Sequence, residues 1–101
     1  MMKKYQCIIM LNPTLDDDAL TKAITSFEEL ITNNGGVVRQ KSTPKKIEMG
    51  YRIKKKKDCY YVLVDFELEP QKVKGIDSLL RLNETILRFT IVVKKEKEAL
   101  R

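Results

Sequence analysis

Three neighbouring carboxylates, Asp16, Asp17 and Asp18, come closest to catalytic chemistry, because paired carboxylates can act as general acid and base. The chain of 101 residues contains no histidine, which removes the usual general base and every Ser-His or Cys-His nucleophile pair. The aspartates also precede an apolar stripe with helical spacing, where Asp16 would be the N-cap and its neighbours would favour the helix dipole. Capping explains them better than catalysis, so we expect no catalytic residues and no enzyme.

Two further features could hold a metal or a phosphate, and neither has the required spacing. Cys7 and Cys59 lack a CxxC pattern and sit inside apolar, strand-like runs, so we expect buried thiols and neither a disulfide nor a zinc site. Gly35-Gly36 follows a helical stripe and precedes a strand, the reverse of a loop that cradles phosphate at a helix N-terminus. The sequence therefore predicts no metal site, no cofactor and no small-molecule substrate.

Basic side chains form the remaining cluster, and their chemistry is the binding of polyanions. The 20 Lys and Arg exceed the 14 Asp and Glu, which gives a net charge of +6. Segment 45–57 holds seven basic residues against one acid, Glu48, so it alone carries +6 and the rest of the chain sums to zero. Such polarisation indicates a nucleic-acid partner. A lysine run that only solubilises a loop would give the same count.

One window of the sequence partly matches the RNA-recognition motif, which stacks bases on aromatic side chains of its central strands. Residues 57–64 keep the lysine, Tyr61 and Val62 of that pattern, but have Cys59 for its first aromatic residue and Tyr60 for its small one. A single-stranded RNA binder using Tyr60 or Tyr61 is therefore the alternative function. A regulatory or enzymatic domain acting on an anionic metabolite is a third, and would need a closed pocket with convergent basic groups.

Hydrophobic periodicity predicts the elements that must position these residues. Apolar patterning indicates strands over 5–11, 59–68 and 87–93, and a second strand that opens at Val37-Val38 and resumes over 47–53. Apolar residues at helical spacing indicate helices over 20–31 and 73–80. The order βαββαβ, with both helices on one face of a four-stranded antiparallel sheet, is the ferredoxin-like arrangement of an α+β domain. The opposite sheet face, with Ile8 and Met10, would then be free.

Turn and capping residues mark the boundaries of these elements. Asn33–Gly36 should end the first helix, Pro70 should open the second, and Asn83 could cap its C-terminus. Pro44 should interrupt the second strand, and Lys54–Asp58 should form the loop of a hairpin.

Length and hydropathy bound the organisation of the chain. We expect one RNA-binding domain over 1–95 and a short charged tail over 96–101. No stretch approaches the ~20 apolar residues of a membrane span, and the N-terminal segment lacks a signal-peptide cleavage site. We expect a cytoplasmic protein with no membrane partner.

Short segments along the chain occur in a specific order. They are Lys4-Tyr5, Leu11-Asn12-Pro13, Asn34-Gly35-Gly36, Tyr51-Arg52-Ile53-Lys54, Tyr60-Tyr61-Val62-Leu63, Leu80-Arg81-Leu82-Asn83-Glu84 and Ile86-Leu87-Arg88-Phe89. In this order and spacing, from Lys3 to about Lys95, the chain resembles the bacterial small-subunit ribosomal protein six family. Segment 43–50 departs from the family pattern, because it lacks the usual aromatic-glycine turn.

The resemblance implies a structural constituent of the small ribosomal subunit. Such a protein binds small-subunit rRNA in the central domain, at the platform, together with small-subunit ribosomal protein eighteen. The positions that it matches to phosphate contacts are Lys3, Lys4, Arg88, Lys94 and Lys95. Arg81 and Asn83 would serve the partner protein or the RNA. The lysine run Lys54, Lys55, Lys56 and Lys57 would add an auxiliary electrostatic arm. The resemblance fits a protein of a bacterial ribosome and a protein of an organellar ribosome equally well.

Overall fold

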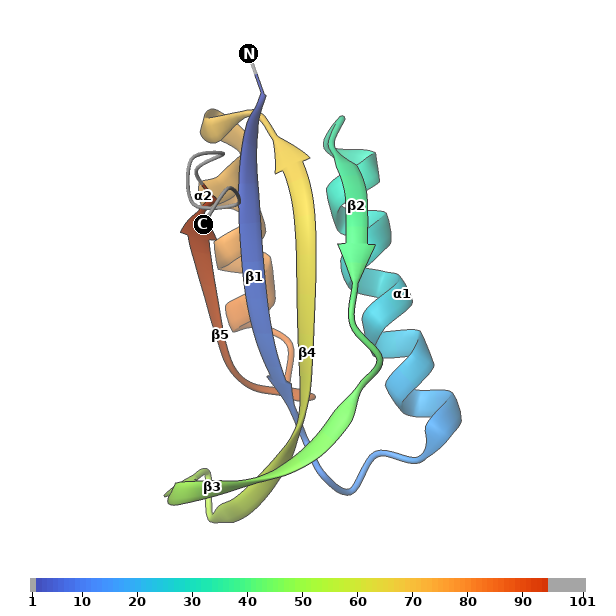
Figure 1. The fold of residues 1–101 in the computed structure, drawn as a ribbon, viewed down its shortest axis with the longest axis vertical. Coiled ribbons are helices and arrows are strands. Elements are labelled where there is room, and N and C mark those ends of the chain that lie inside the picture. The colour runs from blue at the N-terminus through green and yellow to red at the C-terminus, as the bar shows by residue number, and fades with distance from the viewer. Residues whose placement is uncertain (1, 95–101) are drawn as a thin grey trace, which may run out of the picture.

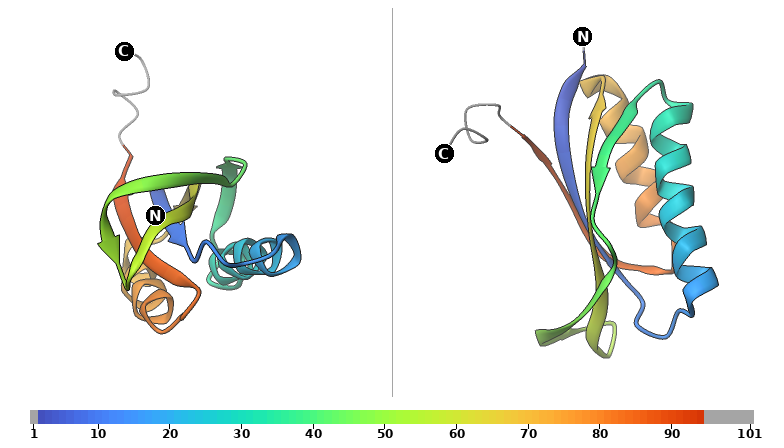
Figure 2. Two further views of the ribbon diagram at one scale, coloured as in Figure 1. Left: turned by 90° about the horizontal axis from the view of Figure 1, so that it is seen from below. Right: turned by 45° about the vertical axis from the view of Figure 1, so that its right-hand side comes forward.

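The fold is an antiparallel sheet covered on one face by two helices, as a computed structural model that describes residues 2–94 shows (Figure 1). Its elements are β1 (Lys3–Leu11), α1 (Asp17–Asn33), β2 (Val37–Lys41), β3 (Lys45–Ile53), β4 (Lys56–Leu68), α2 (Pro70–Arg81) and β5 (Ile86–Val93). The strand order is β2-β4-β1-β5, and β3 pairs with β4 beyond the end of β2. Both helices lie on the same side of the sheet (Figure 2). The expected ferredoxin-like α+β fold is confirmed; Lys95 and the tail over 96–101 lie outside the described residues.

The sheet has five strands where four were expected, because the second expected strand is divided at 42–44. Pro44 has no N–H to donate to a ladder. Ser42 bridges the gap, since its N–H donates to the Leu63 carbonyl at 2.8 Å and its Oγ accepts from the Leu63 N–H at 2.9 Å. Strands β2 and β3 therefore form one bent edge along β4.

The hairpin between β3 and β4 is tighter than the sequence predicted. The loop is only Lys54-Lys55, with φ of 51° and 68°, and Lys56–Asp58 belong to β4. Two consecutive positive φ angles are the mark of a type I′ turn, whose twist matches that of the flanking strands. The expected loop over Lys54–Asp58 was wrong because neither central residue is the usual glycine or asparagine.

Helix α1 begins and ends at the residues that the sequence indicated. Asp16 caps it, because its Oδ1 accepts from the Ala19 N–H at 2.8 Å. At the other end Gly35 has a φ of 83°, and the Gly36 N–H donates to the Ile31 carbonyl at 2.9 Å. With the Gly35 N–H donating to the Thr32 carbonyl at 3.0 Å, this bond forms a Schellman motif, in which Gly35 is the left-handed residue. Asp16, Asp17 and Asp18 therefore form the N-terminus of the helix.

Helix α2 begins at Pro70, as expected, but Asn83 does not cap its C-terminus. The helix ends at Arg81 with Leu82 as C-cap. The Asn83 Oδ1 instead accepts from the N–H and the Oγ1 of Thr85, at 2.9 and 2.6 Å. Asn83 therefore shapes the turn from α2 into β5, since a short amide side chain readily bonds the backbone two residues on.

Apolar side chains form two separate clusters, one on each face of the sheet. The main core lies between the sheet and the helices, where Tyr5 stacks on Phe66 with ring centroids 5.6 Å apart. A second cluster contains buried Ile53, Cys59 and Leu87, with half-buried Met10, Ile47 and Met49 packed against them. The expectation that Met10 lies on a free face was wrong, because the curled β3–β4 hairpin brings Ile53 over that end of the sheet.

Candidate nucleic-acid interface

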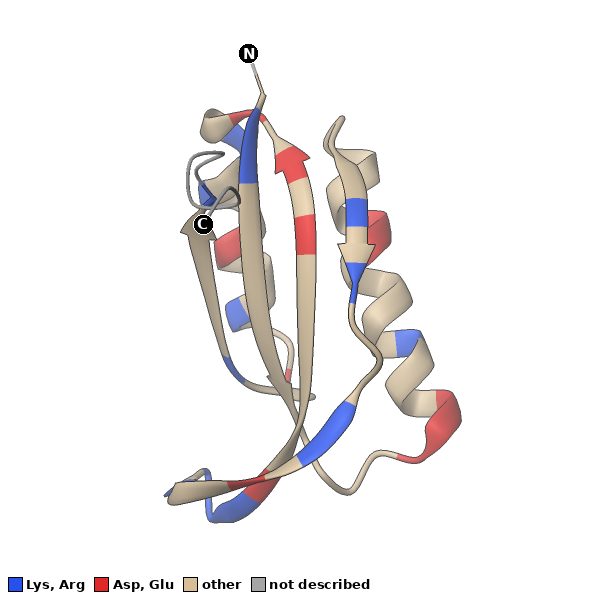
Figure 3. Cartoon of the chain, viewed as in Figure 1, with Lys and Arg blue, Asp and Glu red and all other residues tan. Residues whose placement is uncertain are grey.

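The basic residues that the sequence singled out separate into two groups at opposite ends of β5. Lys54, Arg81 and Arg88 line one open pocket, whereas Lys94 follows the last residue of β5, beside the start of β1. Six residues of extended chain separate Arg88 from Lys94, which corresponds to about 20 Å. Figure 3 shows where Lys and Arg lie along the chain, including those of the hairpin at one end of the sheet. The structure therefore brings some of the predicted contacts together and leaves others apart.

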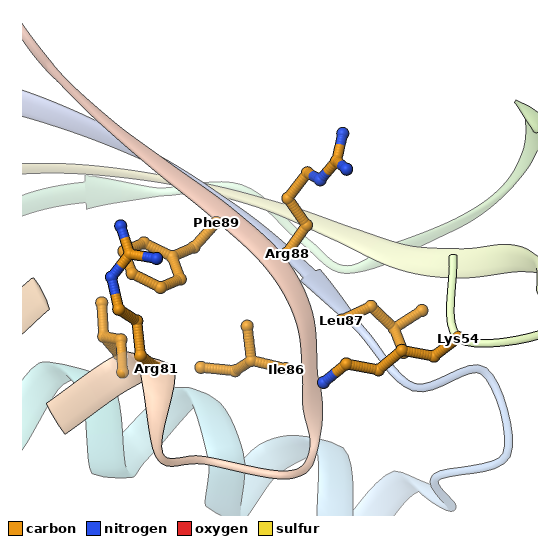
Figure 4. A pocket seen from close by; sticks show the side chains of 7 residues that line it. Lys54, Arg81, Ile86, Leu87, Arg88 and Phe89 are labelled. Atoms are coloured by element: carbon orange, nitrogen blue, oxygen red, sulfur yellow. The ribbon is translucent and has the colours of Figure 1, made fainter. Parts of the chain in front are cut away.

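The first group forms what we call the basic groove. It is lined by Lys54, Leu80, Arg81, Ile86, Leu87, Arg88 and Phe89, and its volume is about 310 Å³. Three elements meet there: the C-terminal turn of α2, the start of β5 and the β3–β4 turn. Figure 4 shows Lys54 reaching toward Ile86 and Arg81 standing beside Phe89. Lys54 and Arg81 thus lie beside aliphatic and aromatic side chains, while the Arg88 side chain points away from them.

Arg81 is held in a defined orientation at this groove. Its Nε donates to the Asp77 Oδ1 at 2.6 Å, one helical turn earlier. Its guanidinium carbon lies 5.5 Å from the centroid of the Phe89 ring, within the range of a cation–π contact. The side chain nevertheless keeps 70% of its exposure, so the guanidinium stays accessible to a ligand.

Arg88 reaches the other face of β5 because of a β-bulge. Ile86 pairs with Leu11 and Arg88 with Met10, so Leu87 is the extra residue. A bulge re-aims side chains, and here Leu87 joins the second cluster while Arg88 contacts Tyr51. The Arg88 Nη1 donates to the Tyr51 hydroxyl at 3.1 Å, and its guanidinium carbon lies 5.6 Å from the ring centroid.

The second group, Lys94 with Lys3 and Lys4, lies on the sheet, where Lys94 is bonded to β4 and β1. The Lys94 Nζ lies 2.8 Å from Asp65 Oδ2, and the Lys94 N–H donates to the Lys4 carbonyl at 2.8 Å. Lys3 and Lys4 are exposed on β1, opposite Leu68 and Glu67 of β4. A phosphate that contacted Lys94 would compete with the Asp65 carboxylate.

The β3–β4 hairpin carries an excess of positive charge. In the part of the chain that the structure describes, none of the seven basic residues of 45–57 forms an ion pair. By contrast Arg39, Lys41, Arg81 and Lys94 each pair with a carboxylate. Lys46 lies over the Tyr60 ring at 5.9 Å. The hairpin projects from one end of the sheet, so its field is open to a polyanion (Figure 1).

The two tyrosines of the alternative function lie on different faces. Tyr60 packs against the main core, whereas Tyr61 is half-buried and pairs with Met10 across the other face. Stacking of bases on the face opposite the helices would therefore use Tyr61 alone. This placement gives the alternative one aromatic platform instead of two.

Sequence reasoning missed Tyr51 and Phe89 as members of the candidate interface. Both appear in apolar alternation, which indicates a core position and says nothing about an arginine partner. Arg81 and Phe89 are eight residues apart, and Arg88 and Tyr51 are brought together only by the curl of the hairpin. A sequence signal was present only in the family-like segments 51–54 and 80–89.

Two structural findings bear on other kinds of site. Over residues 2–94, no group of three or more His, Cys, Asp or Glu side chains could hold a metal ion. No helix in the same residues is long and apolar enough to cross a membrane.

Comparisons with known proteins agree over almost the whole chain. The family profile described as Ribosomal protein S6 matches residues 4–93. Small ribosomal subunit protein bS6 of Micrococcus luteus is 33% identical over 97 residues, covering 96% of each chain. The protein of the same name from Clostridium kluyveri is 35% identical over 96 residues, covering 95% of this chain and all of its own.

The similarity to solved structures supports the fold and nothing beyond it. The crystal structure of 30S ribosomal protein S6 from Thermotoga maritima superposes with a TM-score of 0.89 over both full chains at 17% identity. The C-terminal domain of the MgtC protein from Mycobacterium tuberculosis gives 0.63 at 12% identity, covering 94% of this chain and 90% of that one. Because two differently named proteins share this fold, the site and the sequence family must carry the functional argument.

Proposed function

The chain belongs to the ribosomal protein S6 family, and from this premise we propose that it is a non-enzymatic, structural protein of the small ribosomal subunit in the cytoplasm. It binds small-subunit rRNA in the central domain together with small-subunit ribosomal protein eighteen. The observation that carries the proposal is the family match over 4–93, which includes every element of the basic groove.

The electrostatics of the molecule support RNA as the main partner. Lys54 and Arg88 line the groove, and the cations of 45–57, which form no ion pair within residues 2–94, extend the positive surface along the hairpin. Phosphate contacts of this kind supply affinity and position the protein but read little sequence. Lys3, Lys4 and Lys94 would contact a second stretch of backbone, at the other end of β5.

The sheet face opposite the helices supplies a surface for the partner protein. Beyond the second cluster, Ile8 pairs with Leu63 and Thr90, and Val92 of the edge strand β5 is 44% exposed. Apolar side chains that stay accessible in the free chain gain stability when a partner covers them. The partner would thus bind beside the RNA-binding groove.

A filter-binding titration tests the proposal. A central-domain fragment of small-subunit rRNA is titrated with the chain, with and without the partner protein, beside an unrelated duplex RNA of equal length. We expect preferential binding of the rRNA fragment that strengthens with the partner and weakens steeply with salt. Equal affinity for the two RNAs in the presence of the partner would contradict the proposal.

A further inference from the structure

We propose that the basic groove holds one unpaired nucleotide of the RNA, whose base stacks on the exposed face of the Arg81 guanidinium. This inference rests on the proposed function and names the RNA feature that the groove recognises. It adds to phosphate binding a requirement for a base that has left its helix.

The first step is that Arg81 is prepared for stacking before any RNA arrives. Asp77 holds the Nε edge of the guanidinium at 2.6 Å, and Phe89 lies 5.5 Å from its central carbon. The side chain is still 70% exposed, so the guanidinium is accessible to a ligand. Guanidinium planes are among the platforms on which proteins stack unpaired bases. The conformational cost of ordering Arg81 is therefore largely met in the free protein.

The second step concerns the surface of the groove. Leu80, Ile86 and Leu87 line it from within the two apolar clusters, where each is at most 8% exposed, so half-buried Phe89 supplies the apolar surface that a ligand can reach. In an RNA duplex the base faces are stacked inside the helix and cannot reach this ring, whereas an unpaired base can. The volume of about 310 Å³ is at the lower limit of small-molecule pockets, which suits one nucleotide.

The third step is the position of Lys54. The left-handed backbone of the turn, with φ of 51° at this residue, places Lys54 among the lining side chains of the groove. No carboxylate of the described residues pairs with its ammonium group. Lys54 is thus available to the phosphate of a nucleotide whose base lies on Arg81, while Arg88 serves the adjoining backbone.

The test uses two RNAs that differ only in the proposed feature. One is a short duplex with a single unpaired 2-aminopurine, and the other is the same duplex fully paired. The Arg81→Lys variant keeps the charge but loses the planar stacking surface. Arg39→Lys is the matched control, because Arg39 lies on β2, at the opposite edge of the sheet. Thermal unfolding of each variant verifies the fold.

The wild-type chain should prefer the bulged RNA and quench its 2-aminopurine fluorescence as the base stacks. Arg81→Lys should lose about tenfold in affinity for the bulged RNA and less than about twofold for the paired one. Arg39→Lys should behave as wild type.

Three outcomes would overturn the inference. The first is equal binding of the two RNAs by the wild-type chain, including no detectable binding of either. The second is an equal loss on both RNAs in Arg81→Lys, which would make Arg81 a phosphate contact. The third is loss of partner-protein affinity with the preference for bulged RNA intact, which would assign the groove to a protein. None of these outcomes affects the rRNA titration with the partner protein, which tests the proposed function. Failure of this inference can therefore be distinguished from failure of the proposed function.

Discussion

The Arg88 guanidinium donates to the Tyr51 hydroxyl at 3.1 Å, across 37 residues of sequence. This contact joins the edge strand β5 to the curled β3–β4 hairpin, above the second cluster. Arg88 and Lys54, which both line the basic groove, belong to the two elements that the contact connects. The hairpin is therefore a positioning element as well as a carrier of charge.

Replacing Arg88 by Ala should weaken rRNA binding without unfolding the protein. The side chain is exposed, so the free energy of unfolding should change by less than about 0.5 kcal/mol. Loss of one phosphate contact should lower affinity about tenfold and reduce the salt slope by about one. Filter binding over a salt series measures both, with Arg39→Ala as the control. An unchanged salt slope would remove Arg88 from the phosphate contacts.

The placement of Arg88 shows where sequence reasoning reached its limit. Periodicity predicted β5 and its exposed positions, but it could not show that Leu87 is an extra residue of a bulge, which depends on pairing with β1. Likewise Pro44 predicted the break in the edge, yet the bridge from Ser42 to Leu63 is a long-range contact. Local rules located the elements and caps. The groove is made where three distant elements meet, so its members could not be grouped from local patterns.

The lysines of the β3–β4 hairpin should strengthen rRNA binding through the positive charge that they place at this end of the sheet. Changing Lys55 and Lys57 together to Gln should reduce the salt slope of rRNA binding by about 1.5 and slow association, because neither residue has an ion pair in the described chain. Lys22→Gln with Lys72→Gln removes the same charge from the two helices. Stopped-flow association at several salt concentrations compares the pairs. Equal effects of the two double variants would contradict the prediction, because rRNA binding would then depend on the net charge of the protein and not on the position of these lysines.

The β3–β4 turn stores strain that a glycine should release. Lys55 has a φ of 68°, a conformation that disfavours side chains with a Cβ atom. Lys55→Gly should raise the free energy of unfolding by about 1 kcal/mol in urea denaturation, since the gain exceeds the greater freedom of glycine in the unfolded chain. Lys57→Gly, within β4, should instead lower it by about 0.5–1 kcal/mol. A change of the free energy of unfolding in the same direction for both variants would contradict the proposed strain at Lys55.

Two glycines should respond in opposite directions to the same added methyl group. A Cβ on Gly36 would lie 2.6 Å from the backbone oxygen of Glu67, because the end of α1 passes close to β4. Gly36→Ala should therefore destabilise the protein by roughly 1–3 kcal/mol. A Cβ on Gly75, within α2, meets nothing within 4 Å, so Gly75→Ala should stabilise by about 0.5–1 kcal/mol. Urea denaturation of both variants decides; a neutral Gly36→Ala would mean that the two elements can separate at no cost.

The buried thiol of Cys7 should make the protein less stable in alkali. Burial, and to a smaller extent the negative charge of Asp77, raise the pKa of Cys7 from 9.0 to about 12. Above pH 9.0 the unfolded chain loses this proton while the folded chain keeps it, so the free energy of unfolding falls as pH rises. Between about pH 8 and about pH 10 the loss from this group should be about 1.4 kcal/mol.

Cys7→Ala isolates this contribution from the lysines and tyrosines that titrate in the same range. The variant is less stable at every pH, because it leaves a cavity in the main core beside β4 and β5. Its free energy of unfolding should nevertheless fall less steeply than that of the wild type between about pH 8 and about pH 10. Parallel curves would mean that the Cys7 thiol ionises as readily in the folded chain as in the unfolded one. Because Cys7 lies on the central strand β1, such a result would require water to enter the core between the sheet and the helices.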